Sequence, residues 1–236
     1  MANNYFNFKQ FTIRQEMSSF KVGTDGVLLG ASANTSGVKS VLDIGTGTGL
    51  LVIMLAQRCD AEIVGIEPDH ESYLEACINV SLCKWSSRIK VENTTLQEYN
   101  PIGIRFDLIV TNPPFFSGSL KNPDPRKSYT RHDDSLTSQD ILDCVSRLLN
   151  EEGQLQLILP YAEGNIFIAE AGKYDLYCNK VLKIRPLATA DIRRLILTFS
   201  RRRNKVIEKF LTIEHGPRHE FTEDYKSLTK DYYLKF

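Results

Sequence analysis

The sequence predicts an α/β fold in which a mostly parallel sheet is covered by helices on both faces. Short runs rich in β-branched and aliphatic residues alternate along the chain with segments of helical periodicity. The strongest run, residues 40–44, leads through a glycine cluster at 45–49 directly into an apolar helical segment at 50–56. A strand, a tight turn and a helix in this order begin a parallel βαβ unit.

The next elements continue the alternation. A strand at 62–66 ends on Glu67, and Pro68 and Asp69 open a helix. Five residues of that helix follow the i, i+3, i+4, i+7, i+8 spacing of a buried stripe: Leu74, Cys77, Ile78, Ser81 and Leu82. Strands at 89–92 and 106–110 follow.

The second half of the chain completes the predicted sheet. Residues 117–136 are polar and too long for an ordinary connection, which indicates a functional loop or a disordered one. Thr137 or Ser138 then caps a helix that ends at Gly153. A further helix is expected at 166–171, and strands at 154–159, 181–185, 193–199 and 210–213. This gives about seven strands, and the last two, joined by the basic turn 201–205, are expected to form an antiparallel pair.

The amino-terminal segment differs from the rest. Phe6, Phe8, Phe11 and Ile13 alternate as in a small hairpin, and a short apolar helix is expected within residues 24–30. The total length of 236 residues fits one domain.

Composition limits the function. Twenty-nine basic residues balance 29 acidic ones, so any nucleic-acid contact must come from local segregation of charge. There is no apolar stretch of membrane-spanning length and no signal-like start, so a cytoplasmic protein is expected. Five cysteines without a Cys-x-x-Cys pair indicate reduced, mostly buried thiols. His215 and His219 have a metal-like spacing, but Gly216 and Pro217 between them disfavour a helix, and no metal is expected.

The glycine turn has the chemistry of a site for a nucleotide-like cofactor. Its glycines let the backbone approach a ligand, and the following helix presents free amides at its positive end. The spacing is Gly-x-Gly-x-Gly rather than the Gly-x-Gly-x-x-Gly of dinucleotide enzymes, and Asp43 just before it would repel a pyrophosphate. Asp43 suits the ammonium of an amino acid instead, and Glu67 is placed for the two hydroxyls of a ribose.

Residues 111–116, Thr-Asn-Pro-Pro-Phe-Phe, leave a buried strand through a rigid corner. An exocyclic aromatic amine is a poor nucleophile because its lone pair is delocalised into the ring. Two acceptors that hold its hydrogens let the nitrogen pyramidalise, and positioning then supplies most of the catalysis. We predict the Asn112 side-chain oxygen and the Pro113 carbonyl as acceptors, Pro114 as further rigidity, and Phe115 as the ring that stacks on the base.

These motifs together resemble a known class of enzymes. The pattern DIGTGTG at 43–49, Glu67 and NPPF at 112–115 resemble class I S-adenosylmethionine-dependent amino methyltransferases. KVGTDGVLLG at 21–30, the Phe-Phe extension, Arg131-His132 and the terminal YYLKF are similar to the tRNA1(Val) adenine-N6 methyltransferase family, nearly from end to end. The resemblance implies methylation of N6 of the adenosine beside the anticodon.

The resemblance also implies an architecture. We expect a Rossmann-like seven-stranded sheet with an antiparallel last strand, in a single domain over residues 1–236. The sequence leaves the oligomeric state open, and a monomer is favoured. Residues 1–39 would form an amino-terminal extension covering the cofactor site, and residues 40–236 the catalytic core.

The implied sites fall into two sets. The residues expected to bind S-adenosylmethionine are Lys21, Thr24, Asp25, Asp43, Gly45, Thr46, Gly47, Gly49, Glu67, Thr95 and Asn112. Thr95 stands where many relatives carry an acidic residue against the cofactor adenine, so a hydroxyl or the backbone would make that contact. The residues expected to hold tRNA around a flipped-out base are Phe116, Lys121, Arg126, Lys127, Arg131, Arg201, Arg202 and Arg203.

Other functions fit parts of the sequence. A protein-glutamine N5 methyltransferase acting on a release factor or ribosomal protein faces the same lone-pair problem, but such enzymes usually carry Tyr in place of Phe115 and a larger amino-terminal domain. DNA adenine methylation is a third possibility. A non-catalytic, cofactor-sensing RNA-binding protein would have no use for an acceptor pair aimed at an amine. A dinucleotide oxidoreductase is disfavoured by the glycine spacing and by Asp43.

Overall fold

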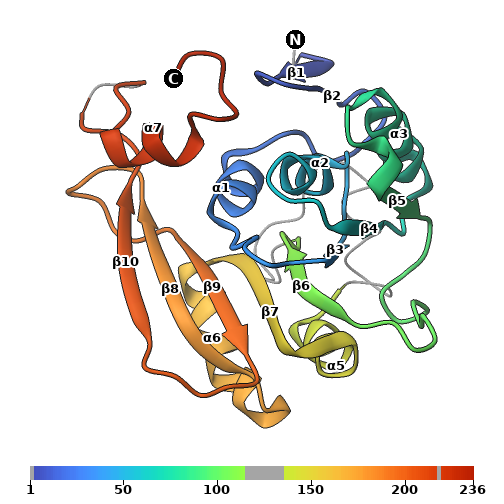
Figure 1. Ribbon diagram of the computed structural model, residues 1–236. Helices are drawn as coiled ribbons and strands as arrows, with labels where there is room; N and C mark the ends of the chain where they lie inside the picture. The colour runs from blue at the N-terminus through green and yellow to red at the C-terminus, as the bar shows by residue number, and fades with distance from the viewer. Residues whose placement is uncertain (1–2, 115–135, 217–218) are drawn as a thin grey trace.

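A central sheet with helices on both faces organises the chain, in a computed structural model that describes residues 3–114, 136–216 and 219–236 (Figure 1). The strands of the sheet are β3 (Ser40–Ile44), β4 (Glu62–Ile66), β5 (Ile89–Glu92), β6 (Phe106–Thr111), β7 (Leu149–Pro160), β8 (Tyr177–Arg185), β9 (Arg194–Ser200) and β10 (Ile207–Thr212). Their order is β10-β8-β9-β7-β6-β3-β4-β5, and β9 alone among them runs antiparallel to its neighbours. The predicted fold class is confirmed.

Two apolar layers lie on opposite faces of the sheet. The helices are α1 (Thr24–Ser32), α2 (Leu50–Ala56), α3 (His70–Leu82), α5 (Ser138–Leu148), α6 (Tyr161–Ala171) and α7 (Glu223–Thr229), with short 3-10 turns η1 (Ser86–Arg88) and η2 (Gly172–Tyr174). Helices α1, α2 and α7 contribute to one buried cluster and α5 and α6 to the other. Strand residues alternate between these clusters, as Ile196 and Leu197 of β9 do, because successive side chains of a strand point to opposite faces. No helix in the described part of the chain is both long and apolar enough to span a bilayer.

The far end of the sheet differs from the prediction. The last two strands do not pair with each other. Strand β10 lies along the outer edge of β8 and pairs with it in parallel, and Val181 lies opposite Glu208. Strand β9 is already bonded on both sides, to β7 and β8, so the free edge of β8 is the position left for β10. The sheet therefore has eight strands, one more than the resemblance implies.

The buried face of α3 is opposite to the predicted one. Leu74, Ile78 and Leu82 are exposed, Leu82 to 65%. The buried residues are instead Ser72, Glu75, Ala76, Asn79 and Val80. The stripe prediction failed because polar side chains on this helix have partners in the amino-terminal segment, which local periodicity does not show.

Two helix-end predictions have different outcomes. Thr137 caps α5 and exchanges hydrogen bonds with Asp140 in a capping box, as predicted. The helix ends at Leu148, however, and Gly153 lies inside β7, where an added Cβ would stand 2.9 Å from the Phe106 carbonyl oxygen. Gly153 thus permits close strand packing and does not end the helix.

The two ends of the chain lie side by side (Figure 1). The predicted hairpin is confirmed as β1 (Tyr5–Asn7) and β2 (Thr12–Arg14). The Lys9 amide donates to the Tyr232 carbonyl over 2.8 Å, and the Lys9 ammonium bonds the carbonyls of Lys230 and Phe236. The carboxy-terminal segment therefore closes over the amino-terminal hairpin.

Candidate active site

Three predicted site segments meet at the carboxyl edge of neighbouring strands. Ile44 of β3 lies opposite Ile66 of β4 on one side and opposite Thr111 of β6 on the other. The glycine turn, Glu67 and Asn112 each follow one of these strands, so the topology brings them together. This edge of an open parallel sheet is where such folds bind ligands.

The glycine turn has the backbone that its sequence predicts. Gly45, Gly47 and Gly49 have φ angles of +72°, +55° and +81°, a region that favours glycine. The amides of Gly45 and Thr46 both donate to the Ile66 carbonyl over 3.0 Å. A Cβ added at Gly45 or Gly47 would meet no atom within 4 Å, so the turn presents open backbone that a ligand can approach.

Asp43 is a fully buried carboxyl with one satisfied oxygen. Its Oδ2 accepts a 2.7 Å hydrogen bond from the Thr46 hydroxyl, whereas Oδ1 has no partner among the described residues. Burial raises the Asp43 pKa to about 7, against the Thr46 bond, and the negative charge of Glu67 adds to the rise. Thr46 fits here because Gly65 lacks a side chain: a Cβ there would lie 2.9 Å from Thr46 Oγ1. A buried orphan oxygen of this kind suits a cationic ligand group.

Glu67 is held in place by backbone amides. Its Oε2 accepts from the Gly47 amide over 2.8 Å and its Oε1 from the Asp69 amide over 3.0 Å. Burial raises its pKa, and these two bonds oppose that rise. The Asn93 side chain also donates to the Glu67 carbonyl over 2.8 Å. The carboxylate therefore stands at the glycine turn in a fixed orientation, with lone pairs left for further donors.

Thr95 has a local role in the structure. Its hydroxyl donates to the Glu98 carboxylate over 3.0 Å and accepts from the Glu98 amide over 3.2 Å. It therefore caps the turn after β5. A contact between Thr95 and a cofactor adenine stays a prediction.

Asn112 lies between the glycine turn and the first turn of α1. The preceding residue, Thr111, is fully buried and donates its hydroxyl to the Ile44 carbonyl over 2.9 Å, which joins the ends of β6 and β3. A Cβ built on Gly26 would lie 3.8 Å from Asn112 Nδ2 and 3.0 Å from the Leu50 side chain. Helix α1 thus packs directly beside the amide. The sequence did not single out Thr111 or Gly26.

The other residues of this corner are only partly described. Pro113 is buried and Pro114 half-buried. Phe115 and Phe116 lie outside the described residues, as do Lys121, Arg126, Lys127 and Arg131. Their predicted stacking and RNA contacts stay predictions.

The predicted amino-terminal site residues lie at the start of α1. Lys21 and Thr24 are exposed just before and at the beginning of the helix. Asp25 Oδ2 forms a 2.8 Å ion pair with Arg194 Nε of β9. The structure brings Asp25 close to Asn112, through the adjacent Gly26, but its polar partner is a protein residue.

Arg201, Arg202 and Arg203 lie at the opposite edge of the sheet from Asn112. They follow β9, which runs antiparallel, so its end lies at the amino edge of the parallel strands. Arg201 donates to the Ser146 carbonyl, Arg202 pairs with Glu152, and the Arg203 guanidinium lies 5.8 Å from the Tyr177 ring centre. The structure therefore does not bring these arginines to the candidate site.

Glu75 is a structural residue that sequence reasoning missed. Its carboxylate accepts hydrogen bonds from three successive backbone amides, those of Glu16, Met17 and Ser18. The only local signal was an acidic residue in a helix, which ordinarily indicates a solvated face.

Asn79, one turn further along α3, ties the amino-terminal segment to the glycine turn. It exchanges two hydrogen bonds with the Arg14 backbone and donates to the Thr48 carbonyl over 2.8 Å. Glu75 and Asn79 together hold the segment that leads into α1.

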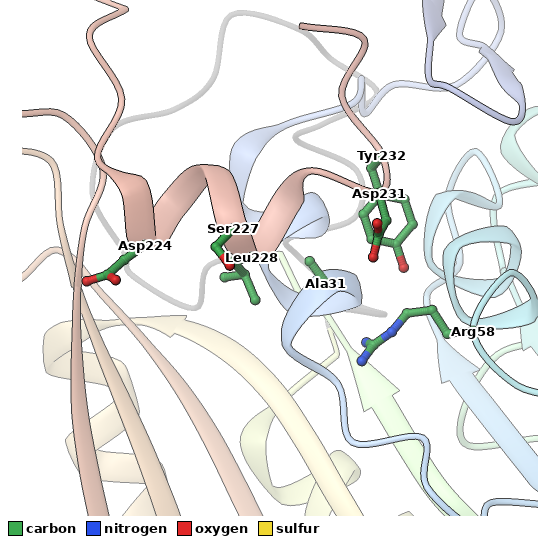
Figure 2. A pocket seen from close by; sticks show the side chains of 7 residues that line it. All are labelled: Ala31, Arg58, Asp224, Ser227, Leu228, Asp231 and Tyr232. Carbon is green, nitrogen blue, oxygen red and sulfur yellow. The ribbon is translucent and has the colours of Figure 1, made fainter. Parts of the chain in front are cut away.

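A separate cavity of about 420 Å³ opens near the end of α1 that is farther from Asn112 (Figure 2). Its lining residues come from the ends of α1 and α2, from α7, and from the segment after α7: Ala31, Arg58, Asp224, Ser227, Leu228, Asp231 and Tyr232. The Arg58 guanidinium donates to the Gly30 carbonyl over 2.8 Å. None of its lining residues belongs to the glycine turn or to the Asn112 corner, so it is distinct from the candidate site.

Known proteins of similar sequence and fold define the class of this chain. The family model of the methyltransferase small domain matches residues 20–163, which include α1, the glycine turn, Glu67 and the Asn112 corner. Solved structures agree on the fold. The chain superposes on a predicted O-methyltransferase from Agrobacterium tumefaciens with a TM-score of 0.68, at 21% identity over 88% of this chain and 96% of that one. A ribosomal protein L11 methylase from Lactobacillus delbrueckii gives 0.57, at 19% identity over 81% and 84%.

Curated relatives narrow the class. A tRNA1(Val) (adenine(37)-N6)-methyltransferase of Trichodesmium erythraeum is 40% identical over the full length of both chains. One of Bacteroides thetaiotaomicron is 41% identical over 99% of each. The chain belongs to the tRNA1(Val) (adenine(37)-N6)-methyltransferase family.

Proposed function

We propose that this enzyme transfers a methyl group from S-adenosylmethionine to N6 of adenosine 37 in tRNA1(Val), the reaction named for its relatives. The observation that supports it most is the position of the Asn112 corner. Thr111 joins this corner to the end of β3, directly beside the glycine turn. The two groups proposed as acceptors for the amine and the open glycine turn proposed for the cofactor are therefore at the same edge of the sheet.

The residues present fit the cofactor. The unpartnered Asp43 Oδ1 would hold the ammonium of its methionine part, and the Glu67 carboxylate would accept from its ribose hydroxyls. The open backbone at Gly45 and Gly47 leaves room for a ligand to approach. When bound, the cofactor supplies an electrophilic methyl group.

The chain's own residues then act on the adenine amine. The Asn112 side-chain oxygen and the Pro113 carbonyl would each accept one N–H, which localises the nitrogen lone pair. The rigid prolines hold these acceptors in place, so their alignment costs little when the substrate binds. No strongly basic residue is required, because two oxygen dipoles stabilise the developing positive charge on nitrogen. The methylated nitrogen is then strongly acidic and releases one N–H proton to solvent.

The proposal has further parts, of which the relatives' names support the tRNA substrate. The substrate partner is tRNA and the site of action is the cytoplasm, where tRNA is modified. We expect a monomer, in which residues 1–39 cover the cofactor site as one part of a single domain. The closeness of Gly26 to Asn112 supports this covering role. Among the described residues no cluster of three metal-ligating side chains occurs.

The test is methylation of unmodified tRNA1(Val) followed by mass spectrometry of its nucleosides. Wild type should produce N6-methyladenosine, and label from the cofactor should not enter release factor or DNA. Asn112→Ala should lower kcat by about 100-fold or more, the usual loss for a preorganised polar contact. Asn34→Ala, an exposed site after α1, serves as the matched control. Full activity of Asn112→Ala would exclude the proposed role of Asn112 as an acceptor for the amine. Label that enters protein instead of tRNA would exclude tRNA as the substrate.

A further inference from the structure

An exposed aromatic residue and two arginines are neighbours along the backbone at the carboxyl end of β7, the sheet edge at which Asn112 follows β6. We call Tyr161, Arg193 and Arg194 the β7–β9 corner. Pro160 ends β7 opposite Arg194, and the Tyr161 amide donates to the Arg193 carbonyl over 3.2 Å. Resting on the function proposed above, we propose that this corner binds the nucleotides that flank the target adenosine: Tyr161 stacks on a neighbouring base and Arg193 contacts its phosphate.

The register of the sheet fixes the distance to the reacting corner. Thr111 lies opposite Leu157, three residues before Pro160 on the adjacent strand. At about 3.3 Å per residue and about 4.8 Å between strands, Pro160 is roughly 11 Å from Thr111. A nucleotide next to one held at Asn112 can reach this position.

The corner is continuous with the site through Arg194. Its guanidinium pairs with Asp25 over 2.8 Å, and Asp25 adjoins Gly26, which lies beside Asn112. Alternation along β9 supports this arrangement: Leu195 contacts the α6 side at Gly164, so Arg194 points to the α1 side. Both side chains of the pair are partly open, Arg194 to 29%.

Tyr161 is rigidly placed and its ring is available. Its side chain is 45% exposed, although it begins a helix packed on the sheet. Its carbonyl accepts from Asn165 over 2.7 Å, and its amide is bonded to Arg193, so the backbone is held on both sides. An exposed aromatic side chain on a fixed backbone, with an arginine at the neighbouring backbone position, offers a ring on which a single-stranded base can stack.

Acidic residues near the corner offset the positive charge of its arginines. Asp191 and Glu163 lie within two residues of Arg193 and Tyr161, so a strong positive field is not expected there. Stacking should therefore carry most of the affinity, with Arg193 adding one phosphate contact. This distinguishes the corner from Arg201, which lies at the opposite edge of the sheet and bonds the Ser146 carbonyl.

The experiment compares variants in steady-state methylation of tRNA1(Val) by the full-length chain. Tyr161→Ala and Tyr161→Leu should raise the KM for tRNA about tenfold, as expected for loss of one stacked base. Tyr161→Phe keeps the ring and should stay within about twofold of wild type. The kcat and the affinity for S-adenosylmethionine should not change in any of them. Arg193→Ala should lower the slope of log affinity against log salt by about 1.

Controls separate this proposal from the proposed function. Tyr5→Ala removes a 55% exposed ring on the hairpin, and Arg105→Ala removes a half-exposed cation at the opposite sheet edge. Both should leave the KM for tRNA unchanged. If the two Tyr161 variants that lack a ring match these controls while wild type methylates tRNA, the corner proposal is wrong and the proposed function stands. Failure of wild type to methylate tRNA would overturn the function instead.

Discussion

At the scale of single residues, the carboxyl of Asp43 carries the clearest sign of a ligand. A buried acid normally satisfies both oxygens, because an unpaired buried polar atom costs free energy. Thr46 satisfies Oδ2, and Oδ1 has no partner among the described residues. The folded protein thus keeps an unfavourable group at the site where an ammonium ion would stabilise it.

Replacing Asp43 should change how stability depends on pH. Its pKa is raised from 3.8 to about 7, so ionisation opposes folding. Below about pH 4 the carboxyl is protonated in both states and does not reduce stability. As pH rises from about 4 to about 7 the carboxyl ionises more readily in the unfolded state, so the free energy of unfolding falls, and this fall levels off above about pH 7. Relative to Asp43→Asn, wild type should lose on the order of 4 kcal/mol of unfolding free energy at most between pH 4 and 8. Urea denaturation at several pH values measures this.

Asp107 provides a control of opposite sign. Burial raises its pKa, but the Lys39 amide, the Asn150 side chain and the Ser40 amide and hydroxyl more than offset this, so the pKa is lowered. Asp107→Asn should therefore lose stability above about pH 4 relative to wild type. Parallel pH profiles for wild type and Asp43→Asn would contradict the assignment of Asp43.

At the scale of elements, α3 holds the amino-terminal extension through polar groups. One carboxylate, that of Glu75, satisfies three backbone amides of residues 16–18. These residues have no strand or helix partner of their own, so the side chain replaces regular secondary structure. Residues 16–18 are thereby held just before α1, whose Gly26 lies beside Asn112.

Glu75→Gln should release this segment. A neutral amide offers one acceptor oxygen in place of two, so at least one buried amide is left unpaired, at a cost of about 1–3 kcal/mol. Hydrogen exchange should become faster at residues 16–18, and the affinity for S-adenosylmethionine should fall. Glu62→Gln, at an exposed start of β4, is the control. Unchanged exchange at 16–18 would show that the carboxylate does not hold the segment.

At the scale of the whole molecule, the two chain ends close one side of the fold. Tyr232 is 2% exposed and donates its hydroxyl to the Met54 carbonyl of α2 over 3.1 Å, while its carbonyl accepts from Lys9. Aromatic rings from both ends pack together, with Phe8 and Tyr233 stacked at 6.0 Å. The terminal YYLKF signature thus fastens the hairpin to α2.

Truncating Tyr232 should destabilise the entire protein. Tyr232→Ala removes a large buried side chain and should lower the unfolding free energy by about 3–5 kcal/mol. Tyr232→Phe removes only the hydrogen bond and should cost about 1 kcal/mol. Tyr5→Ala, at an exposed ring, should change little. Thermal denaturation measures all three, and equal effects of the two Tyr232 variants would argue against burial as the cause.

What the sequence predicted well rests on local chemistry. The conformation of a short segment depends mainly on its neighbours in the chain. This holds for the three glycines with positive φ, for the carboxylate before their turn and for the two prolines after a strand. Parallel strands then bring such segments to one edge, so the core of the site followed from order alone. Other features depended on segments far away in the chain. The predictions of the buried face of α3 and of the partner of β10 were wrong, and the predicted placement of Arg201–Arg203 at the site was not supported.

The sequence by itself determined the α/β class, the glycine turn, the Asn112 corner and the family, because these depend on short-range backbone preferences and on motifs contiguous in the chain. Only the tertiary structure decided that Thr111 joins two strand ends, that Glu75 and Asn79 hold the amino-terminal segment, and that the Tyr161 amide bonds the Arg193 carbonyl at the carboxyl end of β7. These contacts join residues far apart in the chain, and a side chain's partner across such a distance is set by packing rather than by its own neighbours.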